Sequence, residues 1–326
     1  MLDRAKFMLA ALLVSVLAAL CPSGPAAAQT RSKPLTVVAT TGMIADAVKQ
    51  VGGDRVTVTA LMGPSVDPHV YRQTSSDIAG MTRADAVFWH GLYLEAQLED
   101  FFKNLGKRRK VIALADTLPK DKLLAHDEYK ERFDPHLWMD PRLWKGVVTA
   151  ARDALTALDP AGKDIFAANT TRHTAAIDAL ADYSDKAFAS VPPGARVLVT
   201  AHDAFKYFGK AYGYEVMGIQ GISTESEAGL NQIEKLVGTL VERKIGAIFV
   251  ESSVSDRNVK ALIEGAAAKG HKVVIGGELF SDAMGAPGTY EGTYIGMIDH
   301  NATVITRALG GQAPAKGLND RLVALN

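Results

Sequence analysis

The chain has 326 residues, with 36 basic and 36 acidic side chains and a formal net charge of zero. A balanced chain of this kind lacks the basic field that nucleic acid or an anionic membrane surface attracts, so we expect no nucleic-acid partner. Hydrophobic residues make up 48% of the sequence, which is ordinary for a globular protein. The length exceeds that of one average domain and favours two.

The first 28 residues are typical of a secretory signal peptide. A short basic region precedes an apolar stretch over residues 7–20, which is too short for a membrane-spanning helix. Residues 26–28 are alanines, small enough for cleavage before Gln29. We therefore expect export to the periplasm and removal of residues 1–28.

Cys21 is the single cysteine of the sequence and raises an alternative, a lipoprotein signal in which this residue is acylated. Leu20 stands where such a signal prefers a small residue, so we favour cleavage after Ala28 without a lipid anchor. The mature chain would then contain no thiol. Histidine and carboxylate side chains would remain as its metal ligands.

Short apolar runs alternate with helix-length segments in both halves of the remaining chain. The strands predicted in the first half cover residues 35–40, 56–61, 86–89 and 111–114. Those predicted in the second half cover residues 196–200, 214–217, 245–250 and 272–275. This alternation predicts an α/β fold with two lobes, each a parallel sheet with covering helices.

Residues 160–190 predict one long helix between the lobes, because they are rich in Ala, Asp, Lys and Thr and lack Pro and Gly after Gly162. The expected division is a first lobe over residues 29–159 and a second lobe over residues 191–326. A helix resists the wide hinge motion that a flexible linker allows. His173 lies on this helix, and we expect it on a solvated polar face.

Two copies of Asp-Pro-His, at residues 67–69 and 134–136, are the most informative motif. Proline fixes its own φ and restricts the residue before it, so the histidine that follows is held on a rigid corner. A single copy is also common as a surface turn. Two copies, together with a histidine at 202 and an aspartate at 282 that each follow a predicted strand, favour a metal site.

The candidate ligands are His69, His136, His202 and Asp282. Three imidazoles and one carboxylate complete a shell for a borderline divalent metal, and two ligands come from each half of the chain. We therefore expect the ion between the lobes. If all three histidines had ordinary pKa values, more than one proton would compete with the ion below pH 7.

Further motifs are spread over almost the whole chain after the signal peptide, and cover residues 39–44, 66–71, 134–140, 202–208, 221–227, 250–253 and 277–282. Together they resemble the cluster 9 family of solute-binding proteins, the exported metal receptors of zinc and manganese ABC transporters. The resemblance implies that His69, His136, His202 and Asp282 are the ligands. It also implies that one long helix joins the two lobes.

The function implied by this resemblance is that of a periplasmic substrate-binding protein, not an enzyme. It would capture zinc or manganese as a transported ligand and, as a monomer, deliver it to an ABC permease in the membrane. Three imidazoles favour zinc. Members dedicated to zinc often carry a His-rich loop, whereas residues 120–132 contain a single histidine, His126. The sequence therefore does not decide between zinc and manganese.

Two other functions are considered. A secreted metallohydrolase would keep an open metal position and a general base, but the sequence has no His-Glu-x-x-His and four protein ligands leave little room for a reactive water. A surface adhesion or interaction protein has no specific motif in its favour. We expect Glu251 to accept backbone hydrogen bonds at a loop rather than to bind metal.

The remaining acidic and histidine side chains near these motifs are expected to have no ligand role. Glu225 and Glu227 are expected to be solvated. The histidines expected to be structural or exposed are His90, His126, His271 and His300.

Overall fold

The computed structural model describes residues 33–127 and 129–323. The predicted signal peptide over residues 1–28, including Cys21, lies outside the described residues. Within the described ranges, no helix is both long enough and apolar enough to cross a bilayer.

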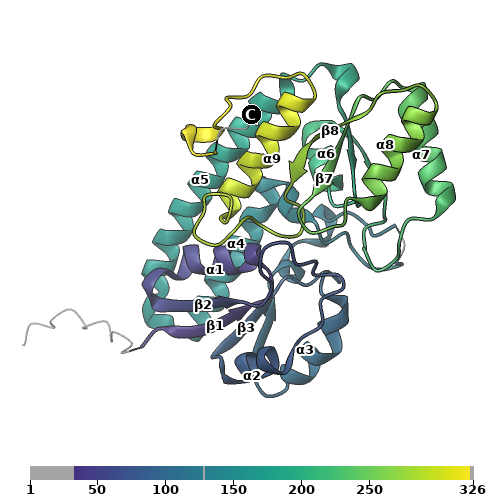
Figure 1. The fold of residues 1–326 in the computed structure, drawn as a ribbon. Coiled ribbons are helices and arrows are strands. Elements are labelled where there is room, and N and C mark those ends of the chain that lie inside the picture. Colours follow the sequence, from purple (N-terminus) through teal and green to yellow (C-terminus); the bar gives the residue numbers. More distant parts are fainter. Residues whose placement is uncertain (1–32, 128, 324–326) are drawn as a thin grey trace, which may run out of the picture. The chain divides into compact units, whose positions relative to one another are not determined.

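The first lobe is built on a four-stranded parallel sheet in the order β2-β1-β3-β4 (Figure 1). Its strands are β1 (Leu35–Ala39), β2 (Val56–Ala60), β3 (Ala86–Trp89) and β4 (Lys110–Ala113). The four strands predicted in this half are confirmed, and their ends agree with the prediction to within one residue. The central strands β1 and β3 are mostly buried, which matches their apolar sequences.

The helices of the first lobe are α1 (Gly42–Gly52), α2 (Ser75–Arg83), α3 (Glu99–Leu105) and α4 (Pro141–Leu158), and all but α3 begin at a polar cap. Thr74 and Asp77 form a capping box at the start of α2. Asp140 caps α4, whose first residue is Pro141, a position where proline loses no helical hydrogen bond.

The predicted linking helix is present as α5 (Lys163–Ala189), which packs against α1, α4 and α9 (Tyr294–Ala308) (Figure 1). The expectation for His173 is wrong, because its side chain is only 6% exposed. It lies on the buried stripe of α5 with Thr170 and Ile177, at spacings of three and four residues. Burial lowers the pKa of His173.

The second lobe contains two parallel strand pairs, β5–β6 and β7–β8, and β5 also contacts β7. The strands are β5 (Val197–Thr200), β6 (Glu215–Gly218), β7 (Ala247–Glu251) and β8 (Val274–Leu279). Its helices are α6 (Lys206–Tyr212), α7 (Leu230–Glu242), α8 (Arg257–Ala268) and α9. The parallel pairs and covering helices agree with the predicted α/β lobe.

Strand β8 begins two residues later and ends four residues later than the predicted strand over residues 272–275. Its two glycines, Gly276 and Gly277, allow a close approach of neighbouring side chains. A Cβ atom on Gly276 would lie 2.8 Å from Phe249, and one on Gly277 would lie 2.5 Å from Val304. The strand therefore continues to Leu279 and brings the following loop to the sheet edge.

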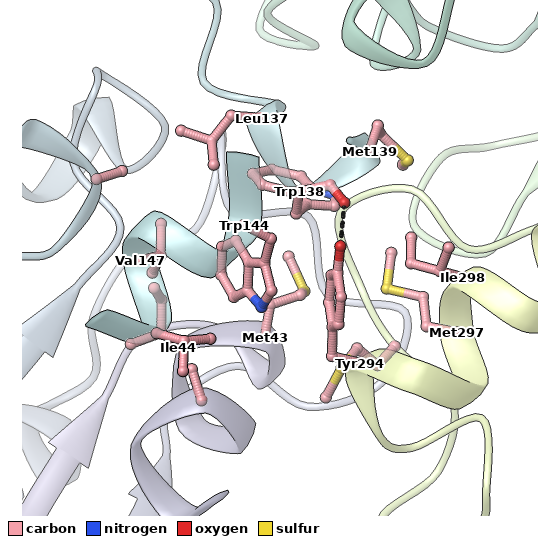
Figure 2. Close-up of a cluster of buried hydrophobic side chains, with 14 of the residues drawn as sticks. Met43, Ile44, Leu137, Trp138, Met139, Trp144, Val147, Tyr294, Met297 and Ile298 are labelled. Atoms are coloured by element: carbon pink, nitrogen blue, oxygen red, sulfur yellow. Dashed lines mark hydrogen bonds between the residues drawn. The ribbon is translucent and has the colours of Figure 1, made fainter. Parts of the chain in front are cut away.

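One hydrophobic cluster includes residues of both lobes, and Figure 2 shows the part where α9 meets the first lobe. The rings of Trp144 and Tyr294 stack with centroids 5.2 Å apart. The Tyr294 hydroxyl donates a hydrogen bond of 2.8 Å to the backbone oxygen of Trp138. Because α9 belongs to the second lobe, the two lobes share a core rather than meeting at a wet interface.

This shared core predicts that the lobes unfold together. Tyr294→Phe removes only the hydrogen bond and should lower the free energy of unfolding by about 1 kcal/mol. Tyr294→Ala also opens a cavity and should cost roughly 3–5 kcal/mol. Urea denaturation followed by far-ultraviolet circular dichroism measures both. Two separate transitions in the unchanged protein would contradict the shared core.

Candidate metal centre

The structure brings all four candidate ligands together at the strand ends. His69 follows β2, His202 lies two residues after β5, and Asp282 lies three residues after β8. His136 lies on the loop before the 3-10 turn Leu137–Met139. One donor atom of each residue lies within 4.8 Å of the others, and every side chain is buried.

The separations between these donor atoms fit a bound ion. A tetrahedral ion with bonds of about 2.0–2.1 Å requires neighbouring donors roughly 3.3 Å apart. The Nε2 atoms of His69 and His136 are 3.2 Å apart. Asp282 Oδ1 lies 3.4 Å from His136 Nε2, and Asp282 Oδ2 lies 3.0 Å from His202 Nε2 and 3.6 Å from His69 Nε2. These four donors therefore surround a space of the size of a divalent metal.

The aspartates of the two Asp-Pro-His motifs have a role that the sequence analysis missed. Asp67 Oδ1 accepts a 2.9 Å hydrogen bond from the backbone N–H of His69, and Asp134 Oδ1 does the same for His136. Asp134 Oδ1 also lies 2.7 Å from Nδ1 of the His136 ring. This contact directs Nε2 of the ring towards the site. The aspartate at position i−2 was the signal, since a short polar side chain commonly accepts the N–H two residues on.

Glu251, at the end of β7, holds His202 in the same way. Its Oε1 accepts the backbone N–H of His202 at 2.8 Å, as expected from the sequence. Its Oε2 also lies 2.5 Å from Nδ1 of the His202 ring, which the sequence analysis did not predict. Glu251 therefore orients a candidate ligand and lies outside the four-residue cluster.

A further hydrogen bond joins two ligand loops from different lobes. Nε1 of Trp138 donates to the backbone oxygen of Ser281 at 2.9 Å. Trp138 lies two residues after His136, and Ser281 directly precedes Asp282. The indole thus fixes the separation of these two ligand loops and belongs to the core shared by the lobes.

Burial and charge act differently on the individual ligands. Burial lowers the pKa of His69 to about 3. Burial alone would also lower the pKa of His202, but the charges of Glu251 and Asp282 raise it well above its usual range. Burial opposes the charge of Asp282, yet the neighbouring imidazoles, His202 first, hold its pKa well below the usual range. His202 therefore lies between two carboxylates that favour its protonated form.

The other histidines are half-buried or buried and lie outside the four-residue cluster. Nε2 of His90 contacts the oxygen of Pro135 at 2.8 Å, and Nε2 of His271 contacts the oxygen of Ile245 at 2.7 Å. His126 is buried, and its ring lies tilted against that of Tyr129 with centroids 4.7 Å apart. These contacts agree with structural roles.

The two acidic residues expected to be solvated, Glu225 and Glu227, are exposed. Each nevertheless has a partner. Glu225 accepts a hydrogen bond from Gln97, and Glu227 pairs with Arg257 at 3.0 Å.

A cavity of about 610 Å³ lies beside the cluster. Asp282 forms part of its wall, with Met62 and Pro64 from the end of β2 and Met284 and Tyr290 from the loop after Asp282. The three histidine ligands are absent from its lining. The carboxylate is therefore the ligand nearest to this space.

Comparison with known proteins finds a matching family and relatives that are named as metal-binding proteins. Residues 37–308 match the model of the family described as "ZnuA: Zinc-uptake complex component A periplasmic". The chain is 44% identical over 302 residues to "Manganese-binding lipoprotein MntA" of Bacillus subtilis (strain 168), covering 93% of this chain and 98% of that protein. It is 46% identical over 277 residues to "Zinc-binding protein TroA" of Treponema pallidum (strain Nichols), covering 85% of this chain and 89% of that protein.

A solved structure of periplasmic zinc-binding TroA from Treponema pallidum superimposes with a TM-score of 0.82 at 44% identity. The match covers 85% of this chain and 99% of that one.

The electrostatics of the cluster predict how many protons an entering ion displaces. His69 is neutral above about pH 4, because its pKa is about 3, and it releases no proton near neutral pH. His202 is protonated below its raised pKa and must lose that proton to bind metal. We expect affinity to fall about tenfold per pH unit below the His202 pKa and to level off above it.

Isothermal titration calorimetry at pH 6.5 in two buffers with different ionisation enthalpies counts the released protons. Glu251→Gln weakens the support of the imidazolium and should reduce the number released. Release of three protons at this pH would contradict the inferred state of His69.

Proposed function

We propose, because this chain belongs to the family of periplasmic zinc-uptake component A proteins, that it binds zinc or manganese between its lobes and delivers the ion to an ABC permease. This family is the one that the motifs of the sequence resemble. The observation that carries the proposal is the convergence of four buried side chains, whose donor atoms lie within 4.8 Å of one another and make four contacts of 3.0–3.6 Å.

Ion capture follows from the state of these donors. Nε2 atoms from His69 and His136 face the carboxylate of Asp282, and His202 exchanges its proton for the metal. Four protein donors leave little space for an activated water, and the acidic side chains next to the ligands already hold backbone and ring N–H groups. The site therefore favours binding over catalysis, and we propose that the chain is not an enzyme.

The relatives carry names of two different metals, manganese for MntA and zinc for TroA, at similar identity. The donor geometry accommodates both. One oxygen of Asp282 completes a tetrahedron suited to zinc. Its second oxygen lies 3.4 Å from His136 Nε2 and allows a higher coordination number that suits manganese. Native mass spectrometry of protein purified from its own cell without added metal identifies the physiological ion.

The proposed place of action is outside the cytoplasmic membrane, next to the permease, as a monomer without nucleic acid. MntA and several further relatives are named lipoproteins. These names count against the expectation from Leu20 that Cys21 is not acylated. The intact mass of the mature protein distinguishes the two forms, since one begins at Gln29 and the other at Cys21 with attached acyl chains.

The proposed ligand set predicts the effect of single substitutions. His69→Ala, His136→Ala and His202→Ala should each weaken zinc and manganese binding by more than about 100-fold, beyond what loss of an orienting neighbour costs. The metal-free fold should persist because each side chain lies on a loop. His271→Ala is the matched control, since this histidine bonds to Ile245 outside the cluster.

Titration calorimetry of both metals measures these effects, and circular dichroism checks the fold. Unchanged affinity for both metals in all three histidine variants would contradict the proposed ligand set. Two other outcomes favour the rival functions. Ester hydrolysis lost in Asp282→Ala would indicate a metallohydrolase, and retention on host matrix proteins after removal of all four ligands would indicate adhesion.

A further inference from the structure

The loop between β6 and α7, residues 219–229, contacts the ligand corners of both lobes. At its start, the N–H of Gln220 donates to the oxygen of Ala201 at 3.0 Å, and the oxygen of Gly221 accepts the N–H of Asp203 at 3.2 Å. Ala201 and Asp203 are the two neighbours of His202 in the chain. The start of the loop is therefore fixed to the backbone on both sides of one ligand.

The middle of the same loop reaches the other lobe. The hydroxyl of Thr224 donates to Oδ2 of Asp67 at 2.5 Å. The other oxygen of Asp67, Oδ1, holds the backbone N–H of His69. One carboxylate thus joins a metal-ligand corner of the first lobe to a loop of the second. The neighbouring residue Glu225 makes a second contact of this kind, with the side chain of Gln97.

We propose that Thr224 is a positioning residue that holds the His69 corner against the second lobe and thereby slows release of the ion. The proposal rests on the metal-binding function argued above. Thr224 is not a ligand, and its hydroxyl acts through Asp67. The half-buried setting of both side chains makes the bond stronger than a fully solvated one.

The geometry also separates this role from a general effect on loop structure. Ser223, the preceding residue, has a hydroxyl that accepts the N–H of Glu225 within the loop. Loss of that hydroxyl disturbs the same loop without touching Asp67. Ser223→Ala is therefore the matched control for Thr224→Val, which keeps the shape of the side chain and removes only the donor.

The test measures metal release from the full mature chain. Manganese-loaded and zinc-loaded proteins are mixed with excess chelator in a stopped-flow instrument, and titration calorimetry gives Kd. Thr224→Val should raise the dissociation rate and Kd about tenfold, as expected for loss of one hydrogen bond to a charged group. Thr224→Ser should restore release to the unchanged rate, and Ser223→Ala should leave it within about twofold.

Two further readouts separate positioning from stability and from the proposed function itself. The rise in melting temperature on adding metal should be smaller for Thr224→Val than for the unchanged protein. In an Asp67→Ala background, Thr224→Val should have no further effect on release. Equal release rates for Thr224→Val and the unchanged protein would overturn the proposed role of Thr224. Failure of the unchanged protein to bind either metal would instead overturn the proposed function.

Discussion

The hydrophobic core that crosses from one lobe to the other is the constraint on which the rest of the structure depends. Trp138 belongs to this core and donates to the backbone beside Asp282, while Tyr294 at the start of α9 bonds to the backbone of Trp138. Because both contacts join segments of different lobes, the ligand loops are fixed relative to one another before an ion arrives. A preorganised site of this kind spends little free energy on ordering its ligands when it binds.

Preorganisation has an electrostatic consequence in the metal-free protein. Three imidazoles and a carboxylate are buried at short separations, and such groups are costly to bury without partners. Three neighbouring acidic residues reduce this cost. Asp67, Asp134 and Glu251 accept hydrogen bonds from the backbone N–H groups of the candidate ligand histidines. The same contacts aim the rings of two of these histidines inwards. Orientation of the ligands and stability of the empty site therefore come from one set of side chains.

Much of this arrangement could be predicted from the sequence, because it depends on local patterns. Apolar runs placed the strands of both lobes to within a few residues, and the repeated Asp-Pro-His contains two of the histidines that meet in the cluster. The sequence could not predict the tertiary contacts between elements that are distant in the chain. His173 looks like part of a polar helix face, but α1 and α9 cover α5 and bury it. The bond between Thr224 and Asp67 joins residues 157 positions apart, and no local pattern predicts it.

The shared core also limits how an ion can leave. Opening the lobes as rigid bodies would separate Trp144 from Tyr294 and expose buried aromatic surface, which costs more than the breaking of a few loop hydrogen bonds. Two loops flank the cluster. Residues 219–229 lie on the side of Asp67, and the segment after Asp282 borders the 610 Å³ cavity and contributes Met284 to the edge of the core. Release through movement of these loops leaves the helices and sheets in place. A permease that displaced either loop would weaken the site without unfolding the protein that delivers the ion.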